Sequence, residues 1–312
     1  MSAARAWLQR WQGTHDGSPL FRPATAEADG PSRIPRIILT TAVDPYEALA
    51  NWGSRMRTWW TLNPEYQYVL LSDADCEAFL VACCPPEEHM AYSLLKRGAA
   101  RADLFRAIFM REVGGVYADQ DAALKQPLRL FIPAWASIVT RISNNGNWDF
   151  VWLAFEPSSP VWNVHVRRVV SQVLTQARFA CMRDTRGCKG FWNCVQNVTG
   201  APAFATSLKE VAERYGCRGV TLRPESCVNA KHGHLRRLVA HHGTELPIEH
   251  VPCHNKKGSR HPCIRPKENQ THYVSIPEAS VNYAHTREGA RYGSSAPGYF
   301  WPLCRDDAHR LY

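Results

Sequence analysis

The stretch from Arg101 to Leu128 constrains the fold more than any other part of the chain, because three structural signals follow one another in it. Apolar residues recur at helical spacing through its first part, which predicts an amphipathic helix. These residues are Leu104, Phe105, Ile108, Phe109 and Val113. Gly114-Gly115 then ends the helix, since glycine adopts the left-handed C-terminal cap at little cost. Residues 116–118 are short, apolar and partly β-branched, so they are predicted to form a buried strand.

Two acidic residues follow that predicted strand directly, in the sequence Asp119-Gln120-Asp121. Residues i and i+2 of an extended chain point the same way, so we expect Asp119 and Asp121 to present their carboxylates side by side. Close carboxylates repel each other and raise each other's pKa unless a cation lies between them. A hard divalent ion such as Mn²⁺ or Mg²⁺ takes oxygen ligands and would remove the repulsion. A D-x-D alone is common by chance, and a pair of solvated turn carboxylates is the alternative.

The order of elements predicts an α/β fold with a mixed, mostly parallel sheet flanked by helices. Strands are predicted at 37–40 and 68–71, with a helix at 45–61 between them. Open sheets of this kind bind ligands at the carboxyl ends of their strands, which is where Asp119 and Asp121 fall. A second D-x-D, Asp73-Ala74-Asp75, follows Ser72 and precedes a helical pattern, so we interpret it as a helix N-terminus.

Length and charge set broader limits. The chain has 312 residues, a formal net charge of +9 and a pI of about 9.1. We expect residues 1–32 to be an N-terminal tail and linker and residues 33–312 to form a single domain. The basic charge favours anionic partners, but it is spread along the chain rather than gathered in a tail, so a nucleic-acid partner is not expected. The sequence contains no run of about 20 apolar residues, so no membrane-spanning helix is predicted.

The cysteines and glycosylation sequons bear on the compartment. There are 11 cysteines, most of them after residue 180, which favours disulfides in an oxidising lumen. Free buried thiols and a zinc cluster around residues 253–263 are the alternatives. The sequons Asn197-Val198-Thr199 and Asn269-Gln270-Thr271 point to the same lumen. The expected location is therefore the secretory pathway.

Several of these segments together resemble a known enzyme family. They are A-R-A-D-L-F-R at 100–106, G-G-V-Y-A-D-Q-D at 114–121 with the Pro-Leu after it, the strand at 34–38, and the strand and turn at 63–73. The pattern is similar to the D-x-D glycosyltransferases of family 32. That family includes the initiating α-1,6-mannosyltransferases, the inositol-phosphoceramide mannosyltransferases and the α-1,4-galactosyltransferases. The resemblance is dense over residues 33–130 and sparse after them, where Thr199-Gly200-Ala201-Pro202 is similar to a T-G-P element with one extra Ala.

The resemblance implies a fold, an activity and a set of site residues. It implies the GT-A fold and the transfer of a hexose, with retention of configuration, from a nucleotide diphospho-sugar to a glycan or glycolipid in the Golgi. Asp119 and Asp121 would bind Mn²⁺ or Mg²⁺, with Asp121 the direct ligand and Asp119 also touching the ribose and sugar of the donor. Asp103 and Arg106 would orient the hexose. Tyr117 would pack beneath the metal site, and His285 would be a further metal or phosphate ligand. Thr40, at the end of the first strand, is a candidate for the nucleotide pocket.

Three alternatives remain open from the residues. Asp103 and Arg106 are three apart, so they could form an ordinary surface ion pair. A D-x-D after an apolar strand also opens phosphatases of the haloacid dehalogenase type, which have Thr or Val two residues after the second Asp, where this chain has Ala123. A catalytically degenerate sugar-binding or scaffold protein of the same fold is the non-enzymatic alternative.

Overall fold

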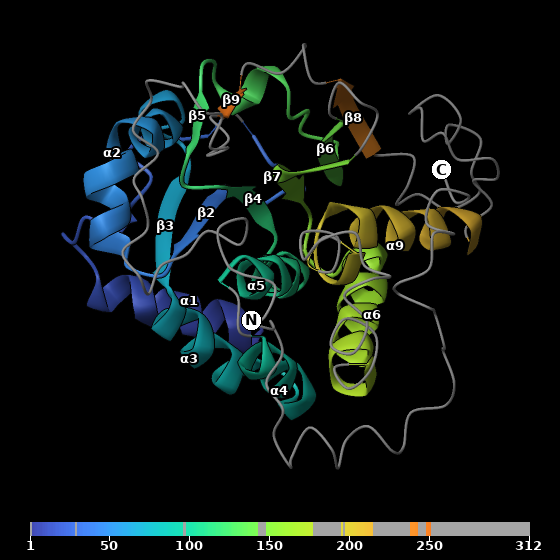
Figure 1. Cartoon of the computed structure of the whole chain (residues 1–312). Coiled ribbons are helices and arrows are strands. Elements are labelled where there is room, and N and C mark those ends of the chain that lie inside the picture. The colour runs from blue at the N-terminus through green and yellow to red at the C-terminus, as the bar shows by residue number, and fades with distance from the viewer. Residues whose placement is uncertain are drawn as a thin grey trace, which may run out of the picture.

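The computed structural model describes residues 2–28, 30–95, 98–142, 148–176, 195, 197–214, 238–242 and 248–250. Helices and strands alternate through these residues (Figure 1). The helices are α1 (Ala3–Thr14), α2 (Pro45–Leu62), α3 (Asp73–Cys83), α4 (Pro86–Leu94), α5 (Gly98–Glu112), the 3-10 turn η1 (Leu128–Leu130), α6 (Pro160–Gln176) and α9 (Ala201–Arg214). The strands are β1 (Phe21–Arg22), β2 (Ile37–Ala42), β3 (Gln67–Ser72), β4 (Gly115–Ala118), β5 (Ala122–Leu124), β6 (Ile138–Ile142), β7 (Trp148–Phe155), β8 (Leu238–His242) and β9 (Ile248–His250).

The main sheet is mixed, with the strand order β1-β3-β2-β4-β7-β6-β8. β2 pairs in parallel with both β3 and β4, whereas β7 is antiparallel to β4 and to β6. β8 is parallel to β6, so β2, β3, β4, β6 and β8 all run in one direction. β5 and β9 form a separate antiparallel pair. The prediction of an α/β fold with a mixed sheet flanked by helices is confirmed.

The helices that connect β2, β3 and β4 determine where the strand order reverses. α2 joins β2 to β3 toward one side of the sheet, and α3, α4 and α5 lead back across β2 to β4 (Figure 1). Right-handed crossovers in opposite directions put α2 and α5 on opposite faces. The strand order therefore reverses at β2 and β4, and their carboxyl ends form a topological switch point, the place where open α/β sheets bind ligands.

The predicted helix–glycine–strand unit is confirmed and lies at the centre of the core. Leu104, Phe105, Ile108 and Phe109 of α5 are all fully buried. The helix closes where the amide of Gly114 donates to the carbonyl of Phe109 at 3.3 Å, and Gly114 has a φ of +75°. β4 then runs between β2 and β7.

Helix α1 and strand β1, within the first 22 residues, pack against α3 and β3. The Trp11 indole N–H of α1 donates to Asp75 Oδ1 of α3 at 2.9 Å, and Leu8 is buried beside it. β1 pairs antiparallel with β3, with Phe21 opposite Val69. The physical reason is that Ala4, Leu8 and Trp11 lie on one face of α1 and cover apolar surface on α3. Gly, Pro and Asp after residue 12 therefore mark turns between packed elements.

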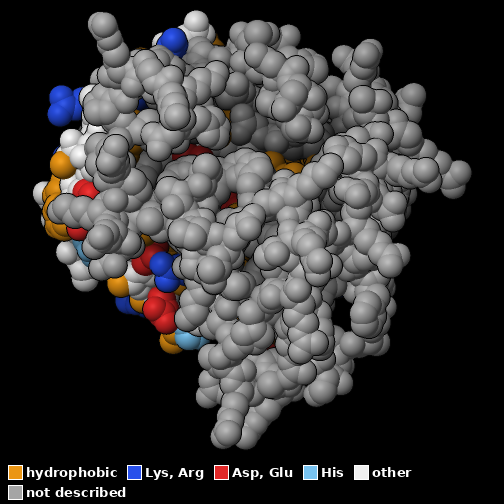
Figure 2. Space-filling model, in the orientation of Figure 1, with side chains coloured by type: hydrophobic (Ala, Val, Ile, Leu, Met, Phe, Trp, Pro, Cys, Tyr) orange, Lys and Arg blue, Asp and Glu red, His pale blue; other side chains and the backbone are white. Residues whose placement is uncertain are grey.

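The described surface is of mixed character. In the part that Figure 2 colours, which lies over α2 and the helices below it, hydrophobic, basic and acidic side chains are intermixed. Among the described helices, none combines the length and the apolarity that crossing a bilayer requires.

Candidate functional site

The two aspartates of the D-x-D lie in a tight turn at the carboxyl end of β4. The amide of Asp119 donates to the carbonyl of Val151 at 2.9 Å, which ends the pairing with β7. The amide of Ala122 then donates to the carbonyl of Asp119 at 3.0 Å, the bond that closes a β-turn over residues 119–122. The sequence argument placed both carboxylates on one side of an extended chain, and that premise is wrong. The turn, rather than strand alternation, sets their directions.

Helix α2 fastens this turn from the side. Arg55 Nη1 lies 3.4 Å from the carbonyl oxygen of Asp121, and the Trp59 indole N–H donates to the carbonyl of Ala122 at 2.9 Å. Thr58 Oγ1 accepts from the amide of Leu124 at 2.8 Å. The three side chains lie at i, i+3 and i+4 on one face of the helix, so one helical surface fixes the backbone from Asp121 to Leu124.

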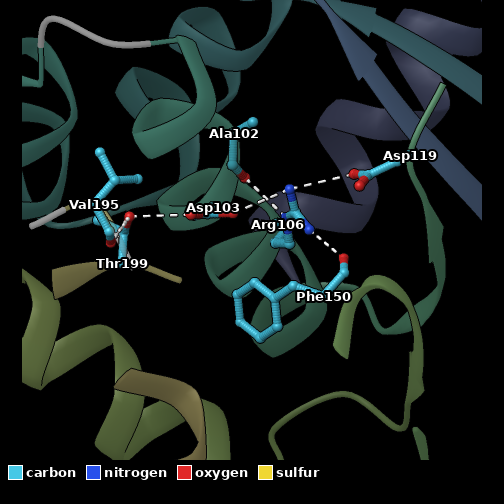
Figure 3. A network of polar contacts seen from close by, with 7 residues as sticks. All are labelled: Ala102, Asp103, Arg106, Asp119, Phe150, Val195 and Thr199. Atoms are coloured by element: carbon cyan, nitrogen blue, oxygen red, sulfur yellow. Dashed lines mark hydrogen bonds and ion pairs between the residues drawn. The ribbon is translucent and has the colours of Figure 1, made fainter. Parts of the chain in front are cut away.

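A buried arginine links the turn to α5 (Figure 3). Arg106 Nη2 lies 3.1 Å from Asp103 Oδ1 and 3.4 Å from Asp119 Oδ1. Its Nη1 donates to the carbonyl of Phe150 on β7. The side chains of Arg106 and Asp103 are 6% and 11% exposed, against 27% for Asp119. The pair is therefore an interior feature, and the alternative of a solvated surface ion pair is wrong.

Two aromatic rings enclose the guanidinium. Its central carbon lies 4.1 Å from the ring centroid of Tyr117 and 5.1 Å from that of Phe150. Stacking on ring faces suits the planar, weakly hydrated guanidinium. Burial raises the pKa of the Tyr117 phenol well above its usual value, and the Asp119 charge adds to that rise. Tyr117 therefore stays protonated and supports Arg106 from below.

Asp103 is held by two partners from different elements. Oδ1 faces Arg106, and Oδ2 accepts from the Thr199 hydroxyl at 3.1 Å. Burial raises the pKa of Asp103, while Arg106 and the Thr199 hydroxyl act in the opposite direction. A buried carboxyl needs such partners, since an unpaired charge in the interior is costly.

Two other residues singled out in the sequence, Thr40 and Asp75, lie away from this turn. Thr40 is 1% exposed, and its hydroxyl accepts from Tyr68 in the core at 2.9 Å, so it lines no open part of this edge. Asp75 closes a capping box with Ser72 at the start of α3, which confirms that the second D-x-D is a helix N-terminus. His285 and the cysteines after residue 180 lie outside the described residues.

The residues present fit a hard divalent cation in part. Asp119 and Asp121 offer carboxylate oxygens at the accessible edge of the sheet, which is the ligand type that Mn²⁺ and Mg²⁺ prefer. Within the described residues, no group of three or more His, Cys, Asp or Glu side chains gathers to enclose an ion. Such a two-carboxylate site would depend on substrate oxygens and water for its other positions.

Sequence reasoning missed some of the residues that shape this site. Arg55 and Trp59 gave no signal beyond a helical pattern, and Phe150 was assigned only to a strand. Thr199 was noted for its likeness to a T-G-P element and as part of a sequon, and nothing in the sequence linked it to Asp103, 96 residues away. These contacts follow from the strand order, which the sequence pattern does not specify.

The fold and the site place this chain among α/β proteins that carry paired carboxylates at the switch point of the sheet. Residues 50–140 match the family described as "Glycosyltransferase sugar-binding region containing DXD motif". Residues 50–140 are therefore similar to the sugar-binding region of the DXD glycosyltransferases, and part of the chain is distantly related to initiation-specific α-1,6-mannosyltransferases.

Two such relatives are fungal. The "Initiation-specific alpha-1,6-mannosyltransferase" of Candida albicans is 26% identical over 116 residues, which cover 36% of this chain and 30% of the relative. The protein of the same name from Schizosaccharomyces pombe is 25% identical over 143 residues, covering 44% and 34%. The match thus spans about a third of these relatives' length. A solved structure, "PaToxG Glycosyltransferase", aligns with a TM-score of 0.41 and 14% identity, over 69% of this chain and 80% of that one.

Proposed function

We propose that this protein is a metal-dependent glycosyltransferase with a GT-A-type fold, which moves a hexose from a nucleotide diphospho-sugar to a glycan or glycolipid acceptor. The observation that carries the proposal is the position of Asp119 and Asp121. They lie in a braced turn at the switch point of the sheet, inside the segment that matches a sugar-binding region. The distant relation to mannosyltransferases makes GDP-mannose the first donor to test.

In this proposal each part of the site has one task. Asp121 and Asp119 supply carboxylate oxygens to a divalent cation, either Mn²⁺ or Mg²⁺. When bound, such a cation acts as a Lewis acid that stabilises negative charge on a departing diphosphate. Arg106 fixes the direction of the Asp119 carboxylate through the 3.4 Å contact. Arg106 and Asp103 contact hexose hydroxyls through their small exposed edges, and the anomeric configuration is retained.

The proposed setting is the secretory lumen, where such donors and acceptors meet. Support comes from the fungal mannosyltransferase relatives and from the two sequons and numerous cysteines of the sequence. His285 is proposed as a third metal or phosphate ligand on the family resemblance alone.

A thermal-shift panel tests the proposal and identifies the donor. GDP-mannose, UDP-glucose, UDP-galactose and UDP-N-acetylglucosamine are each added with Mn²⁺ or with EDTA. A ligand at one hundred times its Kd stabilises the folded state by about 2.7 kcal/mol, which a melting curve resolves easily. We expect one donor to raise the melting temperature with Mn²⁺ and not with EDTA.

Two variants control the panel. Asp121→Asn keeps the size of the side chain and removes its charge, and it should abolish the shift. Glu65→Gln also removes one negative charge, but at the amino end of β3, away from the carboxyl ends of the strands, and should leave the shift unchanged. If no donor stabilises the wild-type protein under either condition, the transferase proposal fails and a sugar-binding or scaffold role takes its place.

A further inference from the structure

The Thr199 hydroxyl lies between two acceptors. Oγ1 is 3.1 Å from Asp103 Oδ2 and 3.1 Å from the carbonyl oxygen of Val195, one helical turn earlier. A hydroxyl carries one hydrogen, so one acceptor takes the larger share of it. The Val195 carbonyl already accepts from the amides of Thr199 and Gly200, at 2.9 and 3.1 Å. Asp103 is the stronger acceptor when ionised, because hydrogen bonds to charged groups are about twice as strong as neutral ones.

Asp103 connects the Thr199 hydrogen bond to the turn at residues 119–122 through Arg106. Its carboxylate is buried, so it has few ways to satisfy its second oxygen other than Thr199. With both oxygens bound, the carboxylate plane is fixed and Oδ1 faces Arg106 Nη2 at 3.1 Å. The same Nη2 atom lies 3.4 Å from Asp119 Oδ1. Figure 3 shows this line of contacts running from Thr199 through Asp103 and Arg106 to Asp119.

We propose that Thr199 is a positioning residue for the donor site, which acts on Asp119 through Asp103 and Arg106. The inference rests on the proposed function, and it adds a residue outside the matched segment 50–140. Thr199 lies two residues before α9, a helix that packs against α6 and β7. The turn that leads into α9 therefore completes a site whose other parts come from α2, α5, β4 and β7.

Removing the hydroxyl should release this line of contacts without removing any group that touches the donor. Without Thr199, Oδ2 of Asp103 has no partner in the described contacts except through reorientation toward Arg106. Arg106 would then turn toward Asp103, and its contact with Asp119 would loosen. The Asp119 carboxylate would sample directions that do not suit the donor, so turnover should fall more than affinity.

The test compares Thr199→Val, which keeps the branched shape, with Thr199→Ser, which keeps the hydroxyl. Thr206→Val is the matched control, because Thr206 on α9 makes the same i−4 bond, to the Pro202 carbonyl at 3.0 Å, and is exposed. Thr199→Ala is a second variant without the hydroxyl, should Thr199→Val not fold. Thermal unfolding establishes that each variant is folded before it is assayed.

Two readouts are used. The first is the guanidinium spectrum of ¹⁵N-arginine-labelled protein without donor, in which Arg106→Lys assigns the Arg106 signals. The second is the rate of metal-dependent hydrolysis of the donor found by the thermal-shift panel. We expect Thr199→Val to broaden or move the Arg106 signals and to lower kcat about tenfold with little change in KM, the size expected for losing one hydrogen bond to a charged group. Thr199→Ser should restore both, and Thr206→Val should match the wild type.

The two proposals fail in different ways. If Thr199→Val leaves the Arg106 signals as in the wild type, or if Thr199→Ser behaves like Thr199→Val, Thr199 does not position the site. If Thr206→Val lowers kcat as much as Thr199→Val does, loss of helix stability explains the effect and the inference is overturned. If the wild type turns over no donor, the proposed function fails, while the donor-free Arg106 spectrum still decides whether Thr199 sets the position of Arg106.

Discussion

Arg106 is the residue on which the geometry of the site depends most. Its guanidinium contacts the carboxylates of Asp103 and Asp119 and the carbonyls of Ala102 and Phe150, and it lies between the rings of Tyr117 and Phe150. Such an arrangement suits arginine and not lysine, because only the planar fork can serve several acceptors while it stacks on a ring. The side chain is therefore part of both the core and the candidate site.

Arg106→Ala should destabilise the protein by about 3–5 kcal/mol, because it leaves the Asp103 carboxylate buried beside an empty space. Urea unfolding with a two-state fit measures the difference. Arg167→Ala, an exposed arginine on α6, is the control and should stay within about 0.5 kcal/mol of the wild type. A loss under about 1 kcal/mol for Arg106→Ala would mean that water replaces the guanidinium and that the site is more open than described.

Gly115 is the tightest glycine of the described residues. Its φ is +111°, and a Cβ there would lie 2.6 Å from the carbonyl oxygen of Ile37 on β2. Gly115→Ala should lower stability by about 2–4 kcal/mol through backbone strain and overpacking. Gly53→Ala, inside α2 with nothing within 4 Å of the added carbon, should raise it by about 0.5–1 kcal/mol. Chemical unfolding of both variants measures the contrast, which would be refuted by equal effects of the same sign.

At this scale the sequence was informative where local chemistry decides. Gly114-Gly115 was predicted to end a helix, and both glycines have positive φ. The direction of the Asp119 and Asp121 side chains was not predictable, because the choice between strand and turn at residues 119–122 depends on a bond to Val151, far along the chain. The pairing of Thr199 with Asp103 is equally non-local.

Two D-x-D sequences show how the element around a motif decides its role. Asp119 and Asp121 lie in a turn after a strand, whereas Asp73 and Asp75 lie in the first turn of α3. Asp75 accepts from the Ser72 amide and hydroxyl at 2.9 and 2.6 Å, and also from Trp11. The Asp75 carboxylate oxygens are therefore occupied by hydrogen bonds at the start of α3 and are not available to a metal ion.

Asp75→Ala should therefore lower stability by about 1–2 kcal/mol through the lost cap, and leave Mn²⁺ binding unchanged. Asp121→Asn should do the reverse, weakening Mn²⁺ binding with little effect on stability. Isothermal titration with Mn²⁺, paired with melting curves, separates the two effects. Weaker Mn²⁺ binding in folded Asp75→Ala would place the metal at the other motif.

Helix α6 carries a buried histidine that makes the fold sensitive to acid. His165 is fully buried among the rings of Phe150, Trp162 and Phe204. Burial, and to a lesser extent the Arg168 charge, lower the pKa of His165 to about 3. The unfolded chain binds a proton near pH 6.5 and the folded chain does not, so stability is fully present above pH 6.5 and falls as the pH drops toward 3.

Lowering the pH from 6.5 to 5 should reduce the free energy of unfolding by about 2 kcal/mol through His165. Each pH unit between its folded-state and unfolded-state pKa values lowers that free energy by about 1.4 kcal/mol. Unfolding at several pH values, for the wild type and His165→Phe, isolates its share. The stability of the wild type should fall more steeply toward acid than that of the variant, because the variant lacks this histidine. Parallel curves would show that His165 takes up its proton in the folded state as readily as in the unfolded chain.

Helices were predictable from the sequence where the apolar periodicity is long or where a capping residue marks the start of the helix. The α5 pattern and the polar residues at 72–75 gave the right elements, with boundaries close to those of α5 and α3. Residues 5–12 offered a short amphipathic pattern, and residues 13–33 were taken for a linker because they are rich in Gly, Pro, Ala and Asp. The few apolar residues of that short pattern, Leu8 and Trp11 among them, suffice because α3 offers a matching surface and Asp75 accepts the indole N–H.

At the scale of the whole molecule, the residues of the candidate site come together at the carboxyl ends of the parallel strands. α2 fixes the turn, α5 supplies Asp103 and Arg106, and β4 ends in the D-x-D. Thr199, two residues before α9, donates to Asp103. The α/β class was predictable from the alternation of helices and strands, because that alternation is local. The strand order β1-β3-β2-β4-β7-β6-β8 was not, since it depends on pairings between distant segments.

The central claim is that Asp119 and Asp121 support metal-dependent transfer from a nucleotide sugar, and release of hexose from radiolabelled donor tests it most directly. The wild type should release hexose with Mn²⁺ and none with EDTA, and folded Asp121→Asn should be slower by at least about 100-fold, the scale of losing one electrostatic contact to the reaction centre. Equal rates for the wild type and folded Asp121→Asn would contradict the account, as would a wild-type rate that EDTA leaves unchanged.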